Sequence, residues 1–110
     1  MKPYFLFPCA LITAALYAAP MVAQAASAAE QSCRACHKID SKLVGPAFMD
    51  VAARYAKDSD AIGHLKRSML QGSSGKWGSM AMPPNTGLTD AEAERFAHWI
   101  MSLNKPAAKP

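Results

Sequence analysis

Apolar residues recur every three or four positions through the middle and the end of the chain, which is the spacing of one helix face. After residue 25 no stretch alternates regularly between apolar and polar residues, as a half-buried strand would. Glycine and proline separate the periodic stretches. The pattern predicts an all-α domain of about four short helices joined by loops, without internal repeats.

Prolines, glycines and capping residues indicate where the helices begin and end. The first helix is expected over about residues 28–38, and Pro46 suits the first turn of the second. The third follows N-cap candidates at residues 58–60 and ends at Gly72. Residues 89–92 form a capping box for the last helix. The apolar residues expected to face the interior are Phe48, Val51, Ala52, Tyr55, Ile62, Leu65, Met69, Ala93, Phe96, Ala97, Ile100 and Leu103.

The stretch between the third and last helices, QGSSGKWGSMAMPPNTG, has no periodicity over residues 71–87. A loop of that length in so small a domain is usually functional or disordered. Trp77, two methionines and the rigid Pro83-Pro84 pair argue against disorder. The loop is therefore a candidate for a functional role.

Residues 1–25 have the layout of a secretory signal peptide, with Lys2 at the start, an apolar run and a small-residue end. We expect cleavage after Ala25, which leaves residues 26–110 as one domain. Cleavage after Ala28 and a retained membrane anchor are the alternatives. The apolar run is short for a membrane span of about 20 residues.

Twelve basic and eight acidic residues give the chain a net charge of +4. No block of like charges occurs, so we expect no binding to nucleic acid. A modest positive charge suits docking to an acidic protein patch instead. A domain of this size has a marginal core, which a metal, disulfide or cofactor would stabilise.

The stretch SCRACHKID places Cys33, Cys36 and His37 in a C-x-x-C-H motif. A thioredoxin-type redox pair follows a strand of a βαβ unit, which the pattern does not predict. A structural zinc site needs four ligands, and the only other histidines, His64 and His98, are isolated. A disulfide between cysteines so close in sequence closes almost no loop. The motif favours covalent attachment of haem, whose vinyl groups the two sulfurs would reach.

Haem iron has a further axial position, for which Met80 and Met82 are the candidates. Met82 precedes Pro83-Pro84, which disfavours helical geometry at Met82 and stiffens the loop behind it. We expect Met82 to be the ligand opposite His37, with Met80 or an open iron as the alternatives. Ligation by histidine and methionine favours the reduced state of the iron.

Three segments are similar to those of the short class I bacterial cytochromes c of the c-551 type. They are CRACHKIDSKLVGPAFMDVAARYA, QGSSGKWG and AMPPNTGLTDAEAERFAHWI, and the resemblance covers about residues 32–103. It implies a small cytochrome c fold, in which short helices wrap around one covalently bound haem with one edge exposed.

The resemblance also implies roles for individual residues. Cys33 and Cys36 would anchor the haem, and His37 and Met82 would be its axial ligands. The carbonyl oxygen of Pro46 would accept a hydrogen bond from the other nitrogen of His37, which orients the ring.

Further roles implied by the resemblance concern the loop. Trp77 would donate its indole N–H to a haem propionate, and Asn85 would form a hydrogen bond near the Met82 sulfur. Core packing is the alternative for Trp77, and a turn residue is the alternative for Asn85. The basic residue that the family places near the propionates is matched by Ser68, with Arg67 one position away.

These features predict a periplasmic monohaem electron carrier, which is not an enzyme. The family serves cytochrome bc1-type donors and acceptors such as terminal oxidases or nitrite reductases, so the implied partners are periplasmic or membrane redox proteins. We expect a monomer. The alternative function is a haem c enzyme or a gas- or peroxide-binding sensor with an openable sixth position.

Lys38, Lys42 and Lys76 flank the motif and the loop, and either dock acidic partners or form an ordinary solvated face. An apolar wall would keep water from the haem. The residues expected in this wall are Ile39, Leu43, Val44, Phe48, Val51, Leu65 and Met69.

Overall fold

The computed structural model describes Met1 and residues 26–104. Within this range the helices are α1 (Ala28–Ser32), the 3-10 turn η1 (Cys33–Ala35), α2 (Phe48–Arg54), α3 (Ala61–Gln71) and α4 (Asp90–Ser102). The only pairing of β type in the described part is a single bridge between Ser73 and Met82. The predicted all-α architecture is confirmed. The predicted signal peptide lies outside the described residues.

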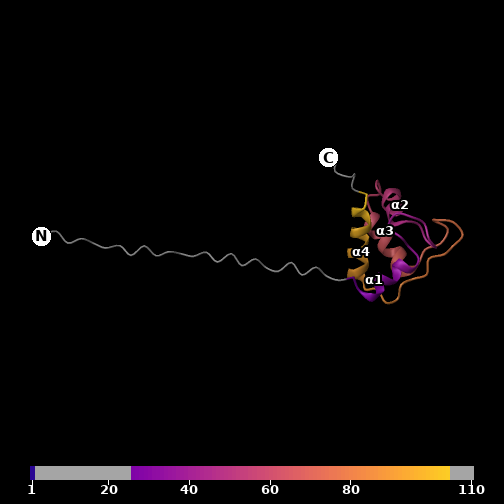
Figure 1. The fold of residues 1–110 in the computed structure, drawn as a ribbon, viewed down its shortest axis with the longest axis horizontal. Coiled ribbons are helices and arrows are strands. Elements are labelled where there is room, and N and C mark those ends of the chain that lie inside the picture. The colour runs from indigo at the N-terminus through magenta and orange to yellow at the C-terminus, as the bar shows by residue number, and fades with distance from the viewer. Residues whose placement is uncertain (2–25, 105–110) are drawn as a thin grey trace.

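Helix α4 packs against both α3 and α2, and the long loop between α3 and α4 lies on the side away from α4 (Figure 1). Ala93 and Ala97 on α4 are completely buried, and their small side chains let the neighbouring helices approach closely. The core consists of Phe48, Val51, Ala52, Leu65, Met69, Leu88, Ala93, Phe96, Ala97 and Ile100. None of the helices between residues 26 and 104 is long and apolar enough to cross a membrane.

The first helix is shorter than predicted. Helix α1 ends at Ser32 and η1 continues only to Ala35, whereas the pattern suggested a helix to about Lys38. The carbonyl oxygen of Cys33 accepts hydrogen bonds from the N–H groups of both Cys36 (3.1 Å) and His37 (3.0 Å). This tight turn ends the helix and brings the motif residues together.

The second helix begins at Phe48, so Pro46 precedes it and does not lie in its first turn as predicted. The first N–H groups of α2 find acceptors in a distant segment. Those of Phe48 and Met49 donate to the carbonyl oxygens of Lys38 and Ile39, each at 2.9 Å. These bonds replace a side-chain cap and fix α2 next to the motif.

The predicted end of α3 and the predicted start of α4 are confirmed. Gly72 follows α3 with a φ of +81°, a left-handed value that favours glycine. The capping box of α4 is present, because Glu92 accepts a hydrogen bond from the N–H of Thr89 and donates its own N–H to the Thr89 hydroxyl. The hydrogen bonds from the backbone and side chain of Thr89 lower the pKa of Glu92.

Helix α1 is attached to the rest of the fold mainly by polar contacts. The Glu30 side chain is buried, and its carboxylate accepts hydrogen bonds from Arg95 of α4 and from the N–H of Ser27, each at 2.7 Å. The amide of Asn85 donates to the carbonyl oxygen of Ala29 at 2.9 Å. These contacts join α1 to the middle of α4 and to the loop that precedes α4.

We predict that Arg95→Met lowers the free energy of unfolding by about 1–3 kcal/mol, because it leaves the buried Glu30 carboxylate without its charged partner. Arg67→Met is the matched control. Arg67 pairs with Asp60 at 3.2 Å, but both side chains are more than half exposed. Arg67→Met should therefore lower the free energy of unfolding by less than about 1 kcal/mol. Denaturant unfolding of the haem-loaded protein measures both, and equal losses would contradict the prediction.

Candidate functional site

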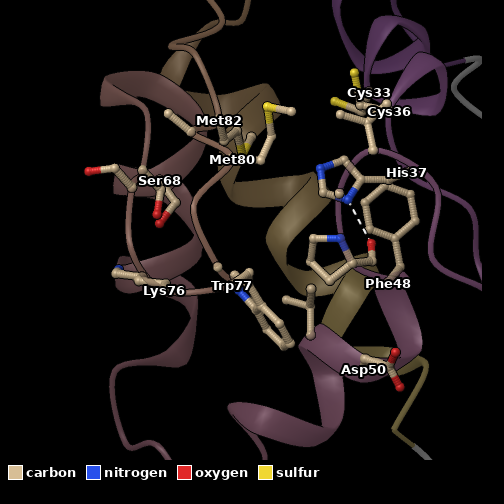
Figure 2. Close-up of a pocket in the computed structure, with 18 of the residues that line it drawn as sticks. Cys33, Cys36, His37, Phe48, Asp50, Ser68, Lys76, Trp77, Met80 and Met82 are labelled. Carbon is tan, nitrogen blue, oxygen red and sulfur yellow. Dashed lines mark hydrogen bonds between the residues drawn. The ribbon is translucent and has the colours of Figure 1, made fainter.

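A cavity of about 430 Å³ opens between the C-x-x-C-H turn and residues 73–83, within the range usual for cofactor pockets. Figure 2 shows Cys33, Cys36 and His37 on one side of it and Met80, Met82, Ser68 and Lys76 on the other. Apolar side chains from three helices form its inner wall. They are Phe48 and Val51 of α2, Leu65 of α3, and Phe96 and Ile100 of α4.

The two cysteines line this cavity, Cys33 at the start of η1 and Cys36 directly after it. Their thiols are not bonded to each other; Cys33 is half-buried and Cys36 is exposed. Burial raises the pKa of the Cys33 thiol, which disfavours the thiolate that a metal would bind. Within the described part no group of three or more His, Cys, Asp or Glu side chains could hold a metal ion. The pair suits thioether formation better than zinc binding.

Two neighbours fix the imidazole ring of His37. Nδ1 lies 2.7 Å from the carbonyl oxygen of Pro46, to which it donates a hydrogen bond, and the ring stacks on Phe48 with centroids 5.0 Å apart. Because Nδ1 holds the proton, Nε2 keeps its lone pair. Figure 2 shows this second nitrogen directed across the cavity towards the methionines.

Because Gly45 has no side chain, the imidazole ring of His37 can lie directly against its backbone. A Cβ atom at this position would lie 2.4 Å from Cε1 and 2.8 Å from Nδ1 of His37. The N–H of Gly45 donates to the carbonyl oxygen of Cys36 at 2.8 Å, which draws the two segments together. Any side chain here would therefore displace the ring.

Opposite His37, the segment of residues 73–82 is closed by its bridge. The N–H of Met82 donates to the carbonyl oxygen of Ser73 at 2.7 Å, and the reverse bond is 2.9 Å long. Met82 is half-buried and packs against the core, whereas Met80 is 67% exposed, although both line the cavity. The fold therefore holds Met82 more firmly than Met80.

The other residues singled out in the loop occupy different places. Trp77 lines the cavity and is partly exposed. The side-chain amide of Asn85 donates to Ala29 and, at 3.3 Å, to Ser32, while its oxygen accepts from the N–H of Gly87. Asn85 therefore ties the loop to α1, and its suggested contact near the Met82 sulfur stays a prediction.

The expected apolar wall is only partly present. Val44, Phe48, Val51 and Leu65 line the cavity, and Met69 lies in the core. Ile39 and Leu43 are 40% and 44% exposed and do not line it. The position that matches the family's basic residue near the propionates is Ser68, which lines the cavity but is not basic, whereas the neighbouring Arg67 pairs with Asp60.

The cytochrome c family model matches residues 22–104 of the chain. The chain belongs to the cytochrome c family. It is 44% identical to cytochrome c-552 of Nitrosomonas europaea over 91 residues, which covers 83% of this chain and 88% of the relative. It is 39% identical to cytochrome c-551 of Pseudomonas aeruginosa over 109 residues, with 93% and 98% covered.

Solved structures agree with this assignment. The crystal structure of wild-type Nitrosomonas europaea cytochrome c552 superposes with a TM-score of 0.65 at 46% identity, covering 66% of this chain and 90% of that one. The chain is thus a class I c-type cytochrome of the c-551 type with the small all-α cytochrome c fold. It is a monohaem electron carrier, not an enzyme, and its haem c is covalently bound through the pair Cys33 and Cys36.

We predict that Gly45→Ala moves the His37 ring and lowers the free energy of unfolding of the haem-loaded cytochrome by about 1–3 kcal/mol. Gly87→Ala is the control, since a Cβ there would meet its nearest atoms at 3.7 Å. Denaturant unfolding gives the stabilities, and the paramagnetic NMR shifts of the His37 ring report its position. Unchanged His37 shifts in Gly45→Ala would count against the packing described here.

Proposed function

We propose that this cytochrome is a periplasmic electron carrier in which His37 and Met82 hold the haem iron from opposite sides. The observation that carries the proposal is the placement of both side chains on facing walls of one cavity, beside Cys33 and Cys36. A covalent anchor, a nitrogen ligand and a sulfur ligand are the donors that a haem c of this type requires.

The bound haem supplies a one-electron couple at its iron. The residues of this chain keep that couple reversible by holding both ligands in place during transfer. The carbonyl oxygen of Pro46 accepts a hydrogen bond from Nδ1–H of His37, which makes Nε2 a stronger electron-pair ligand and prevents ring rotation. The bridge to Ser73 holds the backbone of Met82, so its weak thioether loses little freedom when it binds.

The cavity walls provide an apolar environment for the haem and a contact for one of its propionates. Phe48, Val51 and Leu65 exclude water from the inner side. Trp77 lines the same cavity, which is consistent with its indole N–H holding a haem propionate. We also propose that Asn85 forms a hydrogen bond near the Met82 sulfur in the haem-bound protein.

The proposal includes the location, argued from the sequence, and the partners, argued from the resemblance to the family. Residues 1–25 act as a cleaved signal peptide, residues 26–110 form the exported domain, and haem is attached outside the cytoplasm. Exposed Lys42 and Lys76 line the cavity, and this supports docking of acidic partners. The partners are periplasmic or membrane redox proteins: a cytochrome bc1-type donor and a terminal oxidase or nitrite reductase as acceptor. The carrier works as a monomer.

We predict that the oxidised protein shows a sulfur–iron charge-transfer band, which Met82→Ala abolishes and Met80→Ala keeps. Met80 is the matched control because it is a methionine of the same segment that lines the same cavity. Absorption spectra of the two purified variants make the comparison. A band lost only in Met80→Ala would reverse the ligand assignment, and no band in the wild type would favour an enzyme or sensor with an open iron.

We predict that oxidation by an anionic inorganic complex slows as ionic strength rises, because salt screens the lysines at the cavity. Replacing both Lys42 and Lys76 by glutamine lowers this rate about two- to fivefold at low salt. Lys57→Gln, which does not line the cavity, leaves it nearly unchanged. Stopped-flow absorption measures the rates, and an equal effect of all three charges would argue for a solvated lysine face without a docking role.

A further inference from the structure

Arg54, the last residue of α2, makes two contacts with the tip of the 73–82 segment. Its guanidinium carbon lies 4.5 Å from the centroid of the Trp77 ring, in cation–π geometry. Its Nη1 atom also donates a hydrogen bond to the carbonyl oxygen of Lys76. The two contacts join positions 22 and 23 residues apart in sequence, and no sequence motif predicted them.

The tip of this segment has little other support. Residues 74–81 are all exposed, and the bond from Arg54 to Lys76 is the only hydrogen bond that any of them makes within the described part of the chain. The backbone at Gly75 and Gly78 has positive φ values, and a Cβ at either would meet nothing within 4 Å. Arg54 is therefore the main polar connection between this tip and the helices.

Other basic residues near α3 are engaged elsewhere. Arg67 pairs with Asp60, and Lys66 with Asp90 and Glu94. Arg54 forms no ion pair among the described residues, so its guanidinium is committed to Trp77 and Lys76.

We propose that Arg54 is a positioning residue that holds the 73–82 segment against α2 and thereby keeps the sixth position of the iron closed. The segment is fixed at its base by the bridge between Ser73 and Met82 and at its tip by Arg54. Loss of the tip contact lets the segment open more often, which exposes the iron to external ligands. This step rests on the proposed ligation by Met82.

Arginine suits this role better than lysine. Its planar guanidinium stacks on an indole ring while its N–H groups, directed outwards in the same plane, reach a carbonyl oxygen. A lysine ammonium is a point charge on a flexible chain, and it can satisfy one of these contacts at a time. Arg54→Lys should therefore keep only part of the effect.

The test compares the ferric haem-loaded wild type with Arg54→Gln, Arg54→Lys and Lys57→Gln. Lys57→Gln is the matched control, because it removes the same charge three residues further along, from an exposed side chain. Imidazole is titrated into each protein, and loss of the sulfur–iron charge-transfer band reports displacement of Met82. Hydrogen exchange at the amides of Ser73 and Met82 reports opening of the bridge, and amides in α4 report global unfolding.

Arg54→Gln should bind imidazole about three- to tenfold more tightly, as expected for losing one exposed cation–π contact and one hydrogen bond. Exchange at Ser73 and Met82 should accelerate by a similar factor, and more than exchange in α4. Arg54→Lys should lie between Arg54→Gln and the wild type, while Lys57→Gln should match the wild type.

Unchanged imidazole affinity in Arg54→Gln would overturn the proposal. An equal acceleration of hydrogen exchange in α4 would also overturn it, because Arg54 would then act on overall stability. An equal effect of Lys57→Gln would overturn it too, because the loss of any positive charge in this region would then explain the result. If the wild type lacked the charge-transfer band, the proposed ligation by Met82 would be wrong. Exchange at Ser73 and Met82 would still decide whether Arg54 holds the segment.

Discussion

The hydrogen bond between Nδ1 of His37 and the carbonyl oxygen of Pro46 is the contact on which the rest of the site depends. It assigns the proton to one ring nitrogen and leaves the other with its lone pair, which is what the proposed ligation of the haem iron by His37 needs. The bond is possible because Gly45 carries no side chain and because α2 begins after Pro46, with Phe48 stacked on the ring. One short segment thus orients the imidazole and begins the helix that lines the cavity.

The two walls of the cavity are held in different ways. The histidine side is fixed by backbone bonds from the start of α2 to the segment at residues 38–39 and by the stacking of His37 on the buried Phe48. The methionine side has one backbone bridge at its base and Arg54 at its tip, and it is exposed along most of its length. An electron carrier needs both ligands to stay bound, so we infer that the methionine side limits how well the site stays closed.

The features that could be predicted from the sequence are those that depend on residues close together in the chain. Periodicity and capping residues identified α3 and α4, and C-x-x-C-H identified the attachment site, because these signals lie within a few neighbouring residues. The sequence could not predict that α2 begins after Pro46, since the acceptors for its first N–H groups come from residues 38–39. The contacts of Arg54 and of the Glu30 carboxylate with Arg95 likewise join distant segments, and no pattern of residue types indicates them.

The most direct test of the account is the intact mass and absorption spectrum of the protein after export from a host that attaches haem to cytochromes c. We expect a pigmented protein with the mass of residues 26–110 plus one haem, in which neither Cys33 nor Cys36 reacts with an alkylating reagent. A colourless protein with the mass of the bare polypeptide and two reactive thiols would contradict it.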